Sequence, residues 1–104
     1  MSSDSARDRA LARVAEIRVV RAEVVDAVGD GATTLDQVLE RSVDEPLVAD
    51  IKILTVLESV PDVGKVRARR ILEAAHIDES LRIAELEPDQ RRRLQQAHRE
   101  LVNP

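Results

Sequence analysis

Residues 59–72, SVPDVGKVRARRIL, concentrate positive charge directly behind a predicted tight turn. Pro61 ends the preceding apolar segment, because its ring cannot continue a helical hydrogen-bond ladder, and Gly64 permits a sharp change of direction. The basic residues that follow are Lys65, Arg67, Arg69 and Arg70. No acidic residue interrupts residues 63–72. The pattern favours contact with an anion at this turn.

A helix that begins at this turn offers an anion more than side-chain charge. Its first amides, near residues 64–67, have no carbonyl partner within the helix and lie at the positive end of the helix dipole. Lys65 adds a flexible positive charge, and Arg67 can reach a neighbouring phosphate. Such contacts read no bases, so we expect phosphate binding without strong sequence preference. A solvated basic face beside an ordinary Pro-x-x-Gly turn is the structural alternative.

The turn must be positioned by helices. Residues 5–28 contain neither Gly nor Pro, and apolar residues recur there at intervals of three and four, as in a long amphipathic helix. The expected apolar stripe consists of Leu11, Val14, Ile17, Val20, Val24 and Val28. Gly29 and Gly31 end this helix, and Thr34 with Gln37 predicts a capping box for the next one.

Residues 43–60 are predicted to form two short helices. Their IKILTV segment also suggests a strand, but the spacing of Leu54, Leu57 and Val60 favours helix, and the sequence offers no second strand to pair with it. After the turn, a helix extends to about His76, and Pro88 suits the first position of a final helix. We therefore expect one all-α domain over residues 1–104, with five or six helices.

Length and composition agree with such a domain. The chain has 104 residues, 16 Lys and Arg against 20 Asp and Glu, and no Cys, Phe, Tyr or Trp. Interlocking aliphatic side chains must therefore form the core, and disulfides and Cys-type zinc sites are excluded. No apolar segment approaches the ~18–20 residues of a membrane span, and no signal-peptide pattern is present. We expect a cytoplasmic protein without membrane contact.

Catalytic and metal-binding patterns are missing from the sequence. His76 and His98 have no neighbouring ligand at metal-binding helical spacing, and no serine lies in a nucleophile elbow. Gly64-Lys65 is followed by Val66 rather than Ser or Thr, which excludes a Walker loop. We expect no enzyme activity, no metal, no cofactor and no small-molecule substrate.

The chain resembles the actinobacterial integration host factor family over roughly residues 31–99. The resemblance lies in GATTLDQVLERS, DIKILTVLESVPDVGKVRARRILE and LEPDQRRRL, and VPDVGKVRA is its most specific part. It implies a helix–two-turns–helix DNA-binding module over residues 31–104, preceded by the long helix of residues 1–30. It also implies a nucleoid-associated architectural protein that binds double-stranded DNA with little sequence specificity, and it raises the questions of DNA bending and of assistance to site-specific integration.

The resemblance assigns the phosphate-gripping turn to Pro61, Val63, Gly64, Lys65, Val66 and Arg67. Arg82 matches one position of a basic cluster before the last helix, and Arg92 lies in a stretch that is basic in relatives. Relatives tend to carry an Arg-Arg-x-Arg run where this chain has LRIA (residues 81–84), so weaker DNA binding is expected. Pro61 and Val63 suggest an apolar tip that wedges into a base step and bends DNA; the alternative is that both simply shape the turn.

Two other functions remain open at the level of sequence. Residues 1–60 hold 7 basic and 12 acidic side chains, and with the apolar long helix they suggest a protein-interaction module with weakened or lost DNA binding. RNA is an alternative to DNA, since a phosphate grip does not distinguish them. DNA binding requires Lys65, Arg67, Arg82 and some of residues 91–93 on one surface. We expect a monomer or weak dimer.

Overall fold

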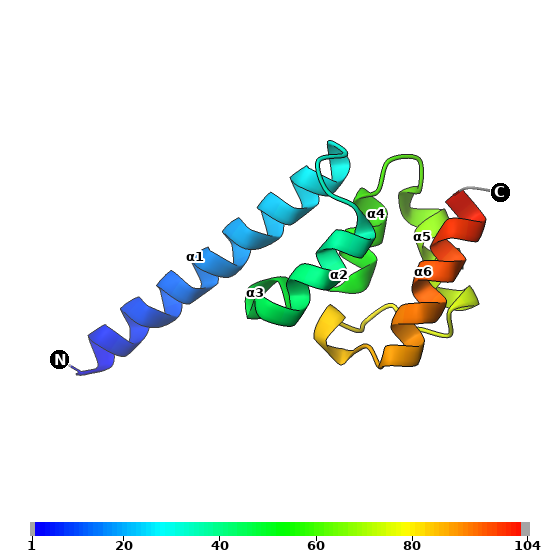
Figure 1. Cartoon of the computed structure of the whole chain (residues 1–104). Helices are drawn as coiled ribbons and strands as arrows, with labels where there is room; N and C mark the ends of the chain where they lie inside the picture. The colour runs from blue at the N-terminus through cyan, green and yellow to red at the C-terminus, as the bar shows by residue number, and fades with distance from the viewer. Residues whose placement is uncertain (1, 103–104) are drawn as a thin grey trace.

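The computed structural model describes residues 2–102, with side chains for residues 5–100. Within that range six α-helices and one 3-10 turn follow one another along the chain (Figure 1). They are α1 (Ser2–Gly29), α2 (Leu35–Asp44), α3 (Pro46–Ala49), α4 (Ile53–Ser59), α5 (Gly64–Ala74), η1 (Ile83–Glu85) and α6 (Pro88–Val102). The all-α prediction is confirmed, as is Pro88 as the first residue of the last helix.

The core lies where α4 and α5 pack on each other, on α6 and on the end of α1. Its largest fully buried side chains are aliphatic and include Ile53, Leu57, Ile71, Leu72, Ile83 and Leu94. Branched side chains from different helices fill the interior without an aromatic ring, as close packing of a compact helical body requires. The packing of α4 and α5 in this core fixes the position of the turn that joins them, which carries the candidate site.

Helix α1 is longer than the body on which it packs. Val24 and Val28 are buried, at 0% and 1% exposure, whereas Leu11 and Val14 on the same expected stripe are 61% and 45% exposed. A helix of this length spans about 42 Å, and the molecule measures 59 × 27 × 24 Å. The N-terminal half of α1 therefore projects beyond the other helices (Figure 1). The predicted long helix is confirmed, and the fully buried residues of its apolar stripe lie in its C-terminal half.

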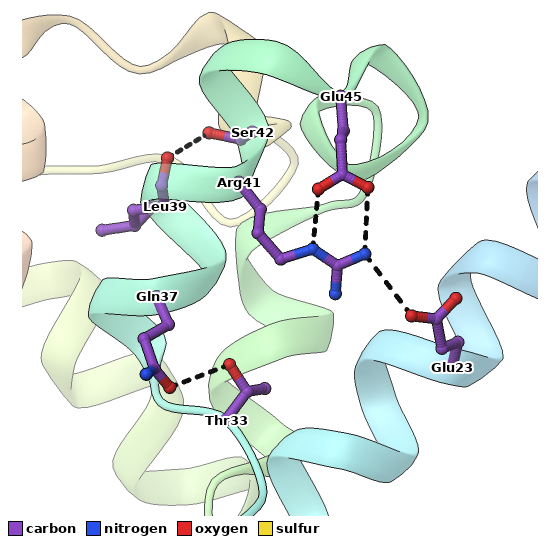
Figure 2. A network of polar contacts seen from close by, with 7 residues as sticks. All are labelled: Glu23, Thr33, Gln37, Leu39, Arg41, Ser42 and Glu45. Atoms are coloured by element: carbon purple, nitrogen blue, oxygen red, sulfur yellow. Dashed lines mark hydrogen bonds and ion pairs between the residues drawn. The ribbon is translucent and has the colours of Figure 1, made fainter.

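Local hydrogen bonds fix the connection from α1 to α2. Figure 2 shows the bond that Thr33 Oγ1 donates to Gln37 Oε1, at 3.1 Å, and the contacts of Arg41. The amide of Gln37 donates to Thr34 Oγ1 at 3.2 Å, and the Thr34 amide donates to Gln37 Oε1 at 2.9 Å, which confirms the capping box. Arg41 donates to both carboxylate oxygens of Glu45, at 2.8 and 3.0 Å, and to Glu23 at 3.4 Å. Arg41 thus joins α1, α2 and the start of α3, and its hydrogen bond lowers the pKa of the Glu45 carboxyl.

The strand-like IKILTV segment becomes helical at Ile53, as favoured by its spacing. Lys52, the residue just before α4, makes one antiparallel bridge with Arg82. Its hydrogen bonds run from the Ile53 amide to Leu81 O at 3.1 Å and from the Ile83 amide to Ile51 O at 3.0 Å. The bridge anchors η1 and Arg82 at the N-terminal end of α4.

Helix α5 ends in a Schellman motif. His76 has a φ of 56°, and its amide donates to Glu73 O at 3.1 Å, while the Ile77 amide donates to Leu72 O at 2.9 Å. Arg93 of α6 donates from Nε to Ala75 O at 2.9 Å. The predicted helix end near His76 is confirmed, and several carbonyls at this end have hydrogen-bond partners.

Candidate functional site

The turn between α4 and α5 alternates between left-handed and right-handed backbone conformations. Asp62 has a φ of 69°, Val63 has φ −86° and ψ −63°, and Gly64 again has a φ of 69°. Consecutive residues of opposite hand direct their successive amides into one concavity, an arrangement called a nest that binds anions. A left-handed conformation suits Gly64, whereas it is strained at Asp62.

Three consecutive amides are available in this concavity. The Val63 amide is used by the turn itself, since it donates to Val60 O at 3.1 Å. Within the described part of the chain, the amides of Gly64, Lys65 and Val66 have no hydrogen-bond acceptor. They begin a helix of 11 residues, so the positive end of its dipole lies at the same place. Backbone chemistry alone therefore makes this turn attractive to an anion.

The basic side chains near the turn have different surroundings. Arg67 donates from Nη1 to Asp62 O at 3.0 Å and so helps to hold the turn. Arg69 pairs with Glu79 at 3.2 Å. Lys65 and Arg70 are exposed, and neither has an ion pair or side-chain hydrogen bond to another described residue. Lys65, beside the free amides, is the cation best placed for a ligand there.

The apolar residues of the turn are divided between core and surface. Val63 is only 5% exposed and belongs to the core, so only its backbone can contact a ligand. Pro61 is exposed, and Val66 is 65% exposed. The expected tip of Pro61 and Val63 is therefore wrong for Val63, because its side chain packs inward. Val66 is the exposed valine of this turn.

Sequence reasoning passed over Asp62, although it stands inside the turn. Its side chain is exposed, and its φ is positive, a backbone conformation that costs less free energy for glycine than for aspartate. A carboxylate beside free amides repels the anion that those amides attract. The signal was available in the sequence, since PDVG places an acid between Pro61 and Gly64.

Arg82 is not part of the turn. It is paired through the backbone with Lys52, before α4, whereas the turn follows α4, and about 12 Å of helix separates the two positions. In Figure 1 the η1 segment and the turn lie at opposite ends of the body. Arg82 Nη1 donates to Asp50 Oδ1 at 2.7 Å. Arg82 and the cations of the turn therefore lie at different ends of α4, and their place on one DNA-binding surface stays a prediction.

The basic stretch of α6 is largely engaged within the protein. Arg91 donates to Ile83 O at 3.2 Å, and Arg93 caps Ala75 O. Arg92 is exposed and pairs with Asp89 of its own helix. Arg91 and Arg93 thus join α6 to η1 and to the end of α5, whereas the contact of Arg92 stays within its own helix.

The described residues form neither a metal site nor a membrane-spanning helix. No group of three or more His, Asp or Glu side chains is arranged there to hold a metal ion. No helix in that part of the chain has the length and apolar character needed to cross a membrane.

The chain matches known proteins over most of its length. Residues 28–98 match the family model described as S13-like H2TH domain. The chain is 36% identical over 84 residues to an integration host factor of Streptomyces coelicolor, covering 81% of this chain and 78% of that one. It is 35% identical over 92 residues to an integration host factor of Mycobacterium tuberculosis, covering 88% of each.

A solved structure is similar in fold as well as in sequence. It is described as sIHF bound to an 8-bp palindromic DNA. The TM-score is 0.75 with 32% identity, and the match covers 86% of this chain and 97% of that one.

Proposed function

We propose that this chain, which belongs to the integration host factor family of actinobacteria, binds double-stranded DNA as an architectural protein of the nucleoid. The observation that carries the proposal is the turn between α4 and α5, where three free amides lie beside Lys65. The similar solved structure contains DNA. The role is one of binding without catalysis, and it requires no cofactor.

One DNA phosphate occupies the concavity of the turn in this proposal. The amides of Gly64, Lys65 and Val66 donate to its oxygens, and the Lys65 ammonium adds charge-assisted contact. Arg67 holds the turn through Asp62 O and presents its remaining N–H groups to a neighbouring phosphate. Backbone amides and flexible cations contact phosphates rather than bases, so binding has little sequence preference.

The affinity is expected to be moderate. Asp62 places a carboxylate beside the phosphate, and the whole chain has a formal charge of −4. Arg82 and Arg92 lie outside the turn, so we propose that the grip depends on residues 61–67 and much less on them. Each phosphate contact adds roughly 0.9 to the logarithmic salt slope, and few contacts therefore mean a shallow slope.

Fluorescence anisotropy of a labelled duplex of about two helical turns, measured across a salt series, tests this proposal. The Lys65→Ala/Arg67→Ala double variant is expected to lose more than about tenfold in affinity and to lower the salt slope by about 1.8. Arg13→Ala/Arg99→Ala is the matched control, since both side chains are exposed and the change in net charge is equal. Helical circular dichroism checks that both variants are folded.

Two results would contradict the proposal. Equal loss of affinity in the control would show that net charge, rather than the turn, determines binding. Absence of binding by the parent protein at low salt would show that this fold serves another partner.

DNA bending depends on a different part of the turn. We propose that the exposed Pro61 and Val66 form the apolar surface that meets the base step next to the held phosphate. Val66→Thr keeps the shape and replaces one methyl group by a hydroxyl, so it is expected to reduce bending more than affinity. Energy transfer between dyes at the two ends of the duplex measures this, and unchanged bending in both Val66→Thr and Pro61→Ala would rule out the wedge.

A further inference from the structure

Lysine is rare in this chain, and one of its lysines lies at the turn between α4 and α5. Lys52 and Lys65 are the two lysines among the 16 Lys and Arg residues, and all the others are arginine. A lysine amine is a common target of acetylation, whereas an arginine guanidinium stays charged. Lys65 follows Gly64 directly, beside the free amides of the turn. The turn therefore carries one side chain that acylation converts from a cation into a neutral amide.

The Lys65 side chain takes no part in holding the fold together. It is exposed, and it makes no ion pair and no side-chain hydrogen bond with the residues that the structure describes. Arg67, two residues later, donates to Asp62 O at 3.0 Å and so helps to hold the turn. A change at Lys65 therefore alters the contact with a ligand and leaves the turn in place, whereas a change at Arg67 alters both.

The position of Lys65 in its helix also separates ligand binding from stability. It is the second residue of α5, and the first turn of this helix contains no acidic residue. A positive charge near the N-terminus of a helix is opposed by the helix dipole. Loss of the Lys65 charge therefore does not destabilise α5, although it removes an attraction for phosphate.

The charge around Lys65 favours an anionic acyl donor. Residues 63–72 contain basic side chains and no acidic one. Asp62 precedes this segment, and its single negative charge is outnumbered by the charges of Lys65, Arg67 and Arg70. The local potential therefore raises the concentration of small anions near the Lys65 amine. An acyl phosphate is such an anion, and it carries an activated acyl group.

We propose that Lys65 is an acylation site, that an acyl phosphate is the donor, and that the modification weakens the DNA grip of the turn. The unprotonated amine attacks the acyl carbon, so that a C–N bond forms and the C–O bond to phosphate breaks. Inorganic phosphate leaves, and the nitrogen releases a proton to water. The product is a neutral amide without the ammonium that contacts a DNA phosphate. The regulatory consequence rests on the proposed DNA binding, whereas the reaction at the amine does not.

Treatment of the full chain with acetyl phosphate tests the proposal. Peptide mass mapping measures the modification of Lys65, and anisotropy of a labelled duplex measures DNA affinity before and after treatment. Lys52→Arg keeps Lys65 as its lysine, and Lys65→Arg keeps Lys52. Each variant is compared with its own untreated form, so the effect of the substitution itself cancels.

Treated Lys52→Arg is expected to lose about threefold to tenfold in DNA affinity. Its logarithmic salt slope should fall by about 0.9, as for the loss of one phosphate contact. Treated Lys65→Arg is expected to keep the affinity and the slope that it had before treatment. Helical circular dichroism and the thermal midpoint should not fall in either protein, because the Lys65 side chain holds no other residue in place.

The reaction and the DNA binding also compete for the same amine. An excess of duplex DNA is expected to slow the acetylation of Lys65, since a bound phosphate covers the ammonium. Lys65→Gln places a neutral amide at this position without any reagent, and it should show the same loss of affinity and the same fall in salt slope as treated Lys52→Arg.

Three results would overturn the proposal. They are an unmodified Lys65 at millimolar acetyl phosphate, full modification of Lys65 with unchanged DNA affinity, or an equal loss of affinity in treated Lys65→Arg. The last result would assign the effect to Lys52 or to the amino terminus. Absence of DNA binding by the untreated protein would remove the proposed function and with it the regulatory role, whereas the mass of the Lys65 peptide would still decide whether this amine is acylated.

Discussion

The two ends of α5 carry the same kind of backbone strain and use it differently. At the start of the helix, Asp62 has a φ of 69°, and at its end, His76 has a φ of 56°. Around His76 the Schellman hydrogen bonds and Arg93 satisfy the carbonyls of Leu72, Glu73 and Ala75. Around Asp62 the amides of Gly64, Lys65 and Val66 have no acceptor in the part of the chain described.

This difference distinguishes a helix end whose backbone groups are paired within the protein from one that we propose to be a binding site. A left-handed non-glycine residue costs roughly 1–2 kcal/mol, and at His76 that cost is offset by hydrogen bonds within the protein. At Asp62 the same strained conformation shapes a concavity whose amide donors can bind an external acceptor. We therefore expect changes at the start of α5 to alter DNA binding, and changes at its end to alter stability alone.

Gly64→Ala gives the largest expected effect. Nothing lies within 4 Å of the added Cβ, so the cost is the positive φ itself, about 1–2 kcal/mol of the free energy of unfolding. Because the nest must distort, DNA affinity should also fall by about tenfold. Denaturation followed by circular dichroism, together with anisotropy, measures both quantities. Gly29→Ala is the control, since its Cβ meets Ser59 O at an ordinary 3.7 Å; equal losses in both variants would remove the special role of the turn.

Asp62 variants are expected to strengthen DNA binding. Asp62→Asn removes the charge and keeps a residue that tolerates positive φ, so affinity should rise severalfold at low salt with little change in stability. Asp62→Gly also relieves the strain and should add about 0.5–1 kcal/mol to the free energy of unfolding. Weaker binding in both variants would mean that the carboxylate contributes to the interface rather than opposing it.

His76→Gly tests the other end of the helix. Glycine adopts the left-handed conformation freely, so the free energy of unfolding should rise by about 0.5–1 kcal/mol. DNA affinity should not change, because no free donor depends on this residue. A change in affinity comparable to that of Asp62→Gly would break the distinction between the two ends.

The smallest expected effect is a pH dependence of folding stability caused by His98, which lies near the turn between α4 and α5. His98 lines a small cavity with Val60 and Pro61, and its Nε2 is buried without a hydrogen-bond partner among the described residues. Burial lowers the pKa of this imidazole, with a smaller opposing effect from Asp36. The folded state then binds fewer protons than the unfolded state, so stability should fall as pH drops below about 6.5.

Thermal unfolding of the parent protein and His98→Leu between about pH 7.5 and 5.5 measures this effect. The carboxyls of Glu45 and Asp78 have lowered pKa values and lose their contribution only at more acidic pH, below their ordinary values of 4.5 and 3.8. The slope in the neutral window should therefore disappear in His98→Leu. An unchanged slope would assign it to other groups.

Much of the candidate site was accessible from the sequence. Pro61, Gly64 and the following cations identified the turn, and the free amides follow from the start of any helix. The capping box at Thr34 was predicted equally well, because its partners are three residues apart. The strain at Asp62 was missed, since its φ depends on how α4 and α5 are joined and an aspartate does not require that conformation.

The sequence by itself determined the helices, their caps and the chemistry of the turn. These features depend on backbone conformation and on hydrogen bonds between residues a few positions apart. The tertiary structure alone decided that Val63 faces the core while Val66 faces solvent, and that Arg82 joins Lys52 instead of the turn. It also brought Arg18 and Arg21 of α1 to one cavity with Lys52 and Arg82. Burial and convergence depend on the packing of elements remote in sequence, and no local pattern of residues encodes that packing.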